Sequence, residues 1–521
     1  MYLYTGIQCG GFFMELNKHI CNQLVEKEYA FAQITLDDDY IVRDNKPDIL
    51  RAIYTKGTIA LEDIKMGNQV VWITGKLHFH TLYLSDDENR RLESVSGEVP
   101  FQEKLMMDNV TEKDEISIDA KIEDLSVGII NSRKLVIRGV INLSGRALEE
   151  QQSEITCRIS EEDGYEQKTE EVTMLCLVDA KKDMIRIQKE LVLPGSKSNI
   201  GELVFYYVDF LNEEIRQKSD GLQIQMDAKV WVLYRSETTG DYEYFETMVQ
   251  VSGSIESDYL TGDEIFWSKI TPLEMLVEPR ADYDGESRML GLEIALSAEV
   301  EFYREENCQM LIDAYSLDNE LCLERKLEKA STFLMKNLSK VRVLEQERLE
   351  PNQEKILQIC GSSGTASIDR MKRLENGVLL EGLLQVHILY NTTSDSMPIA
   401  HCQTHIPFEQ LIEVNGFSEH TTFQMEVKLE QLQVNLLDNT EYEVKAVIQT
   451  ILFAKEPIEF SNVVNMKEES IDMEQMKKQP GMIGCIRREG QDMWDIAKKY
   501  HASTENIIEM GDKVLIIKQV R

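Results

Sequence analysis

One arrangement of alternating apolar and polar residues occurs three times along the chain, and it limits the possible folds more than any other feature. Each copy opens with a short related segment, at residues 46–53, 198–204 and 354–359. An alternating run then ends in the dipeptide Leu-Tyr, which places a tyrosine about every 150 residues, at Tyr83, Tyr234 and Tyr390. Because a period of two places every second side chain on one face, these runs predict β-strands with one buried face.

Each copy continues with further alternating runs, so the repeated unit contains several half-buried strands. Such strands bury their apolar faces by packing in two layers, which predicts a sandwich-like domain in each copy. Pro47 suits the first position of a helix because its φ angle is fixed and it has no N–H, so we also expect one short helix near the start of the unit. The sequence therefore predicts a mostly β protein with three repeated domains, at residues 30–150, 181–316 and 336–456.

Charged segments lie between and around the three copies. Residues 1–29 are predicted to be an N-terminal extension, and Met14 is an alternative start of translation. The connector at residues 151–170 is polar and acidic, whereas the leucines within residues 318–338 favour strands and short turns. Residues 461–480 contain a charged run without apolar periodicity, which predicts a flexible linker.

The last segment, residues 481–521, is predicted to be a separate small domain. Apolar residues recur at three- and four-residue spacing from 493 to 500, which is typical of an amphipathic helix. Ser503 suits the N-cap of a second short helix, and the β-branched run at residues 514–517 predicts a final strand. With a short β-rich start before Gly490, the expected order is strand, helix, helix, strand (βααβ).

The net charge of −36 restricts the classes of partner. Nucleic acids and anionic membrane surfaces both require clustered Lys and Arg, so we expect binding to neither. The segment from Met482 onward has seven basic and six acidic residues, so nearly all of the negative charge belongs to the preceding repeats. Because no stretch approaches the roughly 18 apolar residues of a membrane span, the chain is not expected to be membrane-spanning.

Nine cysteines are scattered singly, without a Cys-x-x-Cys pair. An odd number at irregular spacing favours reduced, mostly buried thiols in a cytosolic protein over a disulfide framework or a zinc site. Residues 2–13 are apolar and aromatic but have neither the basic segment nor the cleavage site of a signal peptide, which favours the same compartment.

The sequence contains no Gly-x-Ser-x-Gly elbow, P-loop or Gly-x-Gly-x-x-Gly loop. His80 and His387 occupy the same position of the first and third copies, where the second copy has Trp231. A position that accepts His or Trp is expected to pack rather than to bind a metal. We therefore predict a protein that is not an enzyme, with no catalytic residues, metal or cofactor.

The repeated unit resembles the SPOCS domain of spore-coat proteins. The resemblance rests on the Leu-Tyr strand, the long Ile/Val/Leu alternation, a Lys-Pro-Asp-Ile-Leu opening at residues 46–50 and an Ile/Val-Pro-Phe step at residues 99–101 and 406–408. The second copy lacks the Pro-Phe step and is the most divergent. The terminal segment, with a Gly turn before a Trp-x-Ile-Ala helix, resembles a LysM module. Three such repeats followed by a LysM module resemble the SipL family of clostridial-type spore formers.

The resemblance to SipL implies a non-enzymatic scaffold for assembly of the spore coat, located at the forespore surface in the cytosol of the mother cell. Its expected partners are the coat ATPase SpoIVA, docked chiefly through the LysM module, and other coat proteins. An alternative function from another class is carbohydrate binding, in which the LysM module binds the N-acetylglucosamine glycans of peptidoglycan or of its lipid-linked precursor.

The LysM resemblance also locates the candidate binding residues. In that family a sugar chain lies in a shallow groove between two loops. The first loop corresponds to residues 489–492 here, whereas the second is nearly deleted, because Gly511 and Asp512 lead directly into the last strand. The loss of that groove wall favours a protein partner over a sugar.

Two methionines and a tryptophan beside the shortened loop provide an apolar, adaptable surface that suits a protein contact. For Trp494 the sequence leaves two interpretations open, a partner contact or a place in the core of the small domain. The candidate residues for partner or glycan binding are Gly490, Gln491, Asp492, Met493, Trp494, Met510, Gly511 and Asp512.

Overall fold

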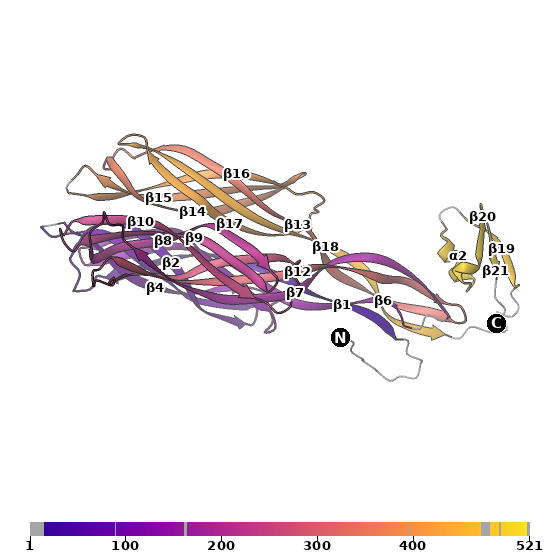
Figure 1. The fold of residues 1–521 in the computed structure, drawn as a ribbon. Helices are drawn as coiled ribbons and strands as arrows, with labels where there is room; N and C mark the ends of the chain where they lie inside the picture. Colours follow the sequence, from indigo (N-terminus) through magenta and orange to yellow (C-terminus); the bar gives the residue numbers. More distant parts are fainter. Residues whose placement is uncertain are drawn as a thin grey trace.

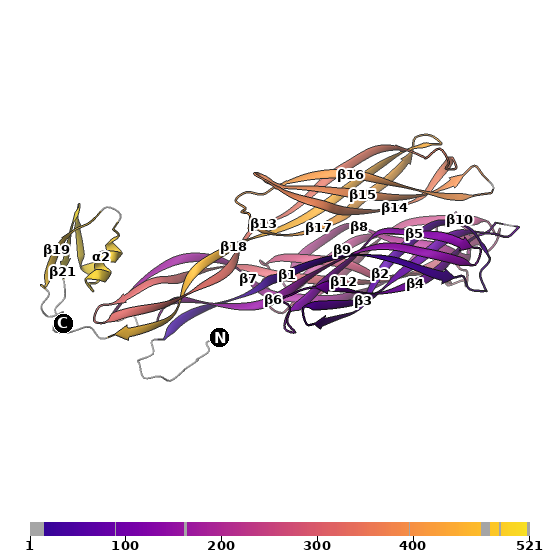
Figure 2. The same cartoon turned by 180° about the vertical axis from the view of Figure 1, so that it is seen from behind.

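The computed structural model describes residues 15–88, 90–160, 164–394, 396–469, 480–488 and 491–517. Nearly all regular structure among them is antiparallel β-strand, which confirms the predicted mostly β fold. Figures 1 and 2 show a broad β body, a narrow arm of paired strands and a small module at the end of that arm. No helix in the described ranges is long and apolar enough to cross a membrane.

The first repeat is a two-layer sandwich. Its six strands are β1 (Leu16–Ile41), β2 (Ile49–Gly67), β3 (Val70–Ser85), β4 (Leu92–Met106), β5 (Glu115–Asn131) and β6 (Lys134–Ile159). They pair as two antiparallel sheets, in the orders β1-β6-β5 and β2-β3-β4. Leu77 and Phe101 from one sheet pack with Ile118 and Ile141 from the other in a single core.

The second and third repeats have the same design. The second contains β7 (Tyr165–Val192), β8 (Ile200–Lys218), β9 (Gly221–Ser236), β10 (Tyr242–Glu256), β11 (Ile265–Arg280) and β12 (Met289–Ser316). The third contains β13 (Glu320–Arg348), β14 (Ile356–Leu374), β15 (Gly377–Thr392), β16 (Ile399–Glu413), β17 (Thr422–Leu436) and β18 (Glu441–Glu469). Their sheets are β11-β12-β7 with β10-β9-β8, and β13-β18-β17 with β14-β15-β16.

The tyrosines that mark the repeats make the same hydrogen bond in all three copies. Each buried hydroxyl donates to the backbone carbonyl 36 residues earlier, in the segment that opens the repeat. The bonds run from Tyr83 to Pro47 (3.2 Å), from Tyr234 to Ser198 (3.3 Å) and from Tyr390 to Glu354 (3.1 Å). The equal spacing shows that the openings and the Leu-Tyr strands occupy equivalent positions, as the sequence predicts.

The short helix expected at Pro47 is not formed. Residues 44–46 form a turn, and β2 follows at Ile49. Although proline suits a helix start, the chain from Ile49 onward is paired with β3, beginning opposite Ser85. Pairing with a neighbouring strand therefore overrides the local preference.

The three sandwiches share a second core. Sheets β2-β3-β4, β8-β9-β10 and β14-β15-β16 contact one another through the faces that point away from their own sandwiches. Leu82, Trp231 and Leu389, one from each repeat, are buried there. These sheets are thus covered on both faces, which explains the almost continuous burial along β9.

The arm consists of three strand pairs that continue beyond the sandwiches. They are residues 16–26 with 148–159, 165–177 with 303–316, and 320–333 with 455–469. One unpaired extra residue interrupts each pair at the boundary with its sandwich: Lys27, Val178 and Leu334. Such a bulge bends a strand and increases its twist. A bulge at the same place therefore bends each of the three strand pairs away from its sandwich and into the arm.

The arm corrects two sequence predictions. Residues 16–29 belong to β1 rather than to an extension, and residues 461–469 belong to β18 rather than to a flexible linker. Residues 1–14 and 470–479 lie outside the described residues, so the remainder of both predictions is not addressed. The two strand segments, 16–29 and 461–469, bury few side chains, among them Cys21 and Val463, and this weak alternation hides them in the sequence.

The terminal module comprises β19 (Met482–Ile486), α2 (Met493–Lys499), a 3₁₀ helix η1 (Thr504–Asn506), β20 (Ile507–Met510) and β21 (Lys513–Ile517). The first helix and the last strand are confirmed. The second helix is a single 3₁₀ turn, although the predicted cap is present, since Ser503 Oγ accepts a hydrogen bond from Glu505 N. The β-branched pair Ile507 and Ile508 then joins β21 as a strand, which gives the sheet order β19-β21-β20.

Candidate functional site

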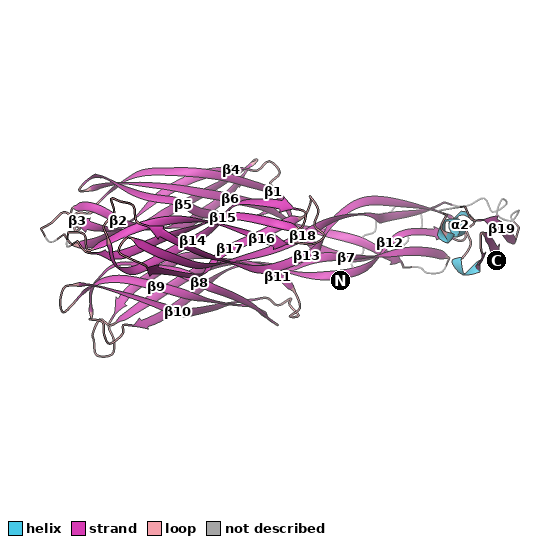
Figure 3. Cartoon of the chain, turned by 90° about the horizontal axis from the view of Figure 1, so that it is seen from above, coloured by secondary structure: helices cyan, strands magenta, loops and turns pink. Residues whose placement is uncertain are grey.

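The helical face of the terminal module lies against the tip of the arm. Figure 3 shows the cyan helices at the end of the long strand pairs. Trp494 Nε1 donates to Asp313 Oδ2 at 2.7 Å, and Lys498 Nζ lies 2.7 Å from the other carboxylate oxygen. The Asp313 carboxylate on β12 thus receives two donors from one face of α2.

An aromatic contact lies beside this ion pair. The ring of Tyr315 meets Trp494 edge to face, with 4.9 Å between centroids. The Tyr315 hydroxyl also donates to the backbone carbonyl of Ala502 at 2.8 Å. Tyr315 is therefore buried under the module, and this burial raises the pKa of its hydroxyl.

Polar contacts surround this centre on both sides. Lys168 Nζ lies 2.8 Å from Asp492 at the N-terminus of α2, and Glu166 accepts hydrogen bonds from the hydroxyls of Ser503 and Thr504. His501 makes two further contacts to the arm. They are Nδ1 to Ser316 O (2.9 Å) and Nε2 to Glu320 Oε2 (3.2 Å).

The charges at this contact are matched. Partial burial by itself raises the pKa of Asp313, but the hydrogen bonds from Lys498 and Trp494 outweigh it and lower that pKa below its usual value. The hydrogen bond from Lys168 likewise lowers the pKa of Asp492. Both carboxylates are thus held ionised at neutral pH by cations across the contact.

The opposite side of the module exposes apolar side chains on its sheet. We call this surface the outer sheet face: Met482, Gly484, Ile486, Ile508, Met510, Lys513, Leu515 and Ile517. Met482, Ile486 and Met510 are each at least 59% exposed, and a Cβ built on Gly484 would meet nothing within 4 Å. The inner face of the same sheet packs on α2 through Val514.

The predicted site residues do not form a single surface. Asp492 and Trp494 face the arm, whereas Met493 packs against the core of the module. Met510 lies on the outer sheet face. Gln491 precedes α2, Gly511 and Asp512 form the turn between β20 and β21, and Gly490 lies outside the described residues. Of the two interpretations for Trp494, the structure supports a contact surface, and the contact is with the same chain.

The two loops that the sequence suggested as walls of a sugar groove lie next to each other. Arg487, between β19 and the first loop, donates its backbone N–H to Asp512 O at 2.8 Å. Its guanidinium also lies 2.6 Å from Glu509 Oε1 on β20. The second of these loops is a tight turn at Gly511, with φ of +65°.

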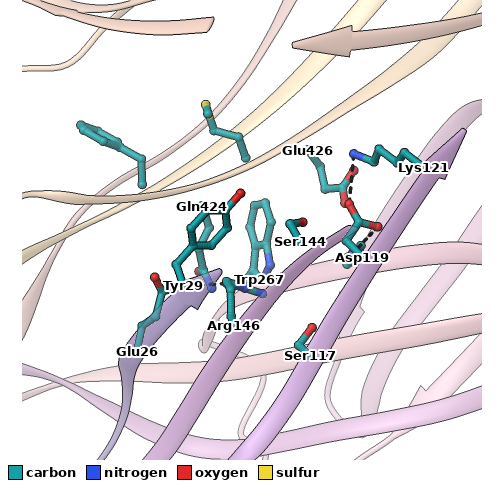
Figure 4. A pocket seen from close by; sticks show the side chains of 13 residues that line it. Glu26, Tyr29, Ser117, Asp119, Lys121, Ser144, Arg146, Trp267, Gln424 and Glu426 are labelled. Carbon is teal, nitrogen blue, oxygen red and sulfur yellow. Dashed lines mark ion pairs between the residues drawn. The ribbon is translucent and has the colours of Figure 1, made fainter. Parts of the chain in front are cut away.

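A polar pocket of about 220 Å³ lies where the three repeats meet (Figure 4). Asp119 accepts from Lys269 at 2.8 Å and contacts Lys121 at 3.3 Å, while Arg146 lies 4.0 Å from Glu26. The pair Asp119–Lys269 joins the first and second repeats, whereas the other two pairs lie within the first. The thirteen lining residues include no His or Cys that could act as a base or nucleophile.

The position shared by His80, Trp231 and His387 lies in the core between the repeats, as expected for a packing site. The His80 ring packs against Phe205 at a tilt, with 4.3 Å between centroids. His387 Nδ1 lies 3.1 Å from His401 Nε2. Burial lowers the pKa of His80 and of His401 to about 4 and that of His387 to about 3.

Sequence reasoning missed the arm tip and most of the outer sheet face. Asp313 and Tyr315 are ordinary residues of a strand, and no local pattern marks them. A signal for the outer sheet face was present, because the short strand 514–517 is apolar on both faces. A strand in so small a module buries one face in its own core, so the second apolar face indicates a contact surface.

Two segments of the chain match a family of known proteins. Residues 48–130 and 355–437 match the family model described as "SipL, SPOCS domain". The segments cover β2 to β5 of the first repeat and β14 to β17 of the third, which are equivalent in the fold. No curated protein and no solved structure matches the chain. The match supports a sporulation-related protein of the SipL type.

Proposed function

We propose that the chain is a non-enzymatic scaffold for spore coat assembly, whose terminal module docks a coat ATPase of the SpoIVA type at the forespore surface in the mother-cell cytosol. The match of two repeats to the SPOCS model supports the sporulation setting. The observation that carries the docking role is the outer sheet face, an exposed apolar surface at the far end of the arm.

The docking surface is the outer sheet face rather than the helical face. The arm already occupies the helical face through Asp313 and Tyr315, so a partner would have to displace these contacts. The outer sheet face needs no such displacement. Its methionines and isoleucines suit a protein partner, because exposed apolar patches of this kind mark association surfaces.

The arm supports this role by separating the module from the repeats. The repeats carry nearly all of the net charge of −36, which would repel an acidic partner close to them. A module that is close to neutral and held at the end of the arm presents its apolar face away from that charge (Figure 2). The repeats remain available for other coat proteins.

The experiment measures binding of the full chain to a purified SpoIVA-type ATPase by biolayer interferometry. The test variant is Gly484→Glu, which places a carboxylate in the centre of the outer sheet face where a side chain meets no obstacle. The matched control is Gly195→Glu in a turn of the second repeat, where a Cβ also meets nothing within 4 Å. We expect Gly484→Glu to weaken binding at least about tenfold, since it buries an unpaired charge at the contact, and Gly195→Glu to bind as the unsubstituted chain does.

Two results would overturn the proposal. One is unchanged ATPase binding by Gly484→Glu with an intact circular dichroism spectrum. The other is binding of chitin oligomers by the full chain together with no binding of the ATPase, which would establish the carbohydrate-binding alternative.

A further inference from the structure

Four cysteines that are far apart in the sequence meet inside the arm. They are Cys21 on β1, Cys157 on β6, Cys176 on β7 and Cys308 on β12. The structure joins Cys21 and Cys176 as a disulfide, 5.3 Å between Cα atoms, across 155 residues of sequence. The prediction that all cysteines are unpaired is therefore wrong for these two, because the arm places strands of different repeats side by side.

Two further metal-ligand side chains point at this disulfide. His19 lies two residues before Cys21, on the same face of β1, and its Nε2 is 2.8 Å from a carboxylate oxygen of Glu306 on β12. The nitrogen is buried, and its contact with Glu306 does not have the geometry of a hydrogen bond. His19 Nε2, Cys176 Sγ and a Glu306 oxygen all lie within 4.8 Å of one another.

We propose that the reduced form of this cluster is a binding site for a thiophilic divalent cation of the Zn²⁺ class. The ligands are the Cys21 and Cys176 thiolates, His19 Nε2 and the Glu306 carboxylate. Two sulfurs, one imidazole nitrogen and one carboxylate oxygen make a four-ligand set that suits tetrahedral zinc. Ligand atoms around such an ion lie about 3.3–3.8 Å apart. His19 Nε2, Cys176 Sγ and the Glu306 oxygen therefore need to move by about 1 Å, while the Cys21 sulfur separates from Cys176 when the disulfide is reduced.

The disulfide and the cation are alternative states of one site. Reduction breaks the S–S bond, and a dithiol or phosphine reductant supplies two electrons while solvent supplies two protons. Binding of the cation then displaces the two thiol protons to solvent. A reducing compartment would shift the site from the disulfide to the dithiol state. Both states tie β1 to β7, and the cation additionally engages β12.

The cluster is a better ligand set than the other cysteines of the described chain. Cys360 and Cys402 are buried singly among apolar side chains of the repeats, and Cys322 is exposed. Cys157 and Cys308 lie next to the site but are not part of the proposed set. The site involves no residue of the terminal module. A negative result for the cation site would therefore leave the proposed docking function unaffected.

The test uses the full chain, reduced with a phosphine and freed of reductant and metal, with Co²⁺ as the spectroscopic probe. We expect about one Co²⁺ per chain, with thiolate-to-cobalt charge-transfer bands and the intense visible bands of tetrahedral cobalt, displaced by Zn²⁺. The oxidised chain should give no such bands. Cys360→Ser and Cys402→Ser are the matched controls and should titrate as the unsubstituted chain does.

Substitutions at the ligands decide the assignment. Cys21→Ser with Cys176→Ser should abolish the thiolate bands. His19→Asn, which leaves every thiol in place and guards against misfolding of the double variant, should weaken Co²⁺ binding at least about tenfold. The proposal is overturned if the reduced chain shows no thiolate band, or if the bands survive the double substitution. It is also overturned if they disappear only when Cys157 and Cys308 are replaced.

Discussion

The indole N–H of Trp494 donates to the carboxylate of Asp313 at 2.7 Å, across 181 residues of sequence. This bond joins the terminal module to the arm and directs the helical face of the module inward. The surface left to a partner is consequently the sheet on the other side. The position of the module thus follows from contacts made chiefly by β7 and β12, elements of the second repeat.

Removal of the Asp313 carboxylate should loosen the module from the arm. Asp313→Ala deletes the acceptor shared by Trp494 and Lys498, and we expect docking to weaken by about 1–2 kcal/mol, since the contact is partly open to solvent. Hydrogen–deuterium exchange should then rise across residues 493–499. The control is Glu505→Ala, which removes an exposed acid of the same module. Equal exchange in the two variants would contradict a role for Asp313 in docking.

The hydroxyl of the repeated tyrosine should stabilise each sandwich to a similar degree. Tyr83→Phe and Tyr390→Phe each leave a backbone carbonyl without its donor, and we expect each to lower the free energy of unfolding by about 1–2 kcal/mol in urea denaturation. The fully exposed Tyr283 supplies the control, because Tyr283→Phe removes a hydroxyl from the surface. If Tyr283→Phe lowered the free energy of unfolding by the same amount, the repeated hydrogen bond would not be what stabilises the sandwiches.

The partly buried histidines between the repeats should make the chain sensitive to mild acid. Unfolded histidine gains a proton below its ordinary pKa of 6.5, whereas folded His80 and His401 stay neutral down to about 4. The unfolded state therefore binds more protons in this interval, and the stability of the folded state falls as the pH is lowered from 6.5 toward 4.

The measurement compares Tm at about pH 7 and about pH 5. In His401→Gln a neutral amide replaces one of these imidazoles, so the loss of Tm at the lower pH should be smaller than in the unsubstituted chain. His78→Gln, an exposed position on the same strand as His80, should leave that loss unchanged. A decrease in Tm that is the same in all three proteins would assign the acid sensitivity to other groups.

The core shared by the repeats should not tolerate a methyl group at Gly361. A Cβ there would lie 2.8 Å from both Trp231 Nε1 and Tyr207 Oη, and the indole is fixed by its 2.6 Å hydrogen bond to Cys360 O. We expect Gly361→Ala to cost about 1–3 kcal/mol of stability in thermal or urea unfolding. Gly195→Ala, in open space, should cost little. Equal stability of the two variants would mean that the shared core adjusts freely.

The strands and the threefold repetition could be predicted because both are visible as residue patterns in the sequence itself. Tyr83, Tyr234 and Tyr390 end alternating runs whose period is that of a half-buried strand, and the structure places them at equivalent positions. The arm strands could not be predicted from the same pattern. Their apolar side chains face a narrow axis shared with other repeats, so residues 461–469 have the composition of a linker.

The candidate site was predictable only in part. Met510 and Trp494 were both named as candidate binding residues, with a core position left open for Trp494, and they lie on different surfaces of the module. Asp313 could not be paired with Trp494 in advance, since a single aspartate on a strand carries no sign of its partner. The same holds for Cys21 and Cys176, whose neighbours come from other repeats.

The sequence by itself thus determined the β-strands, the three equivalent sandwiches and the small terminal module, because these depend on periodicity over a few residues. Only the tertiary structure decided how the sandwiches share a core, how their strands extend into an arm and which face of the module stays exposed. These features depend on contacts between segments more than 100 residues apart, such as that of Trp494 with Asp313. The local residue pattern determines which face of a strand is apolar. The packing of the whole chain determines which segment, if any, covers that face.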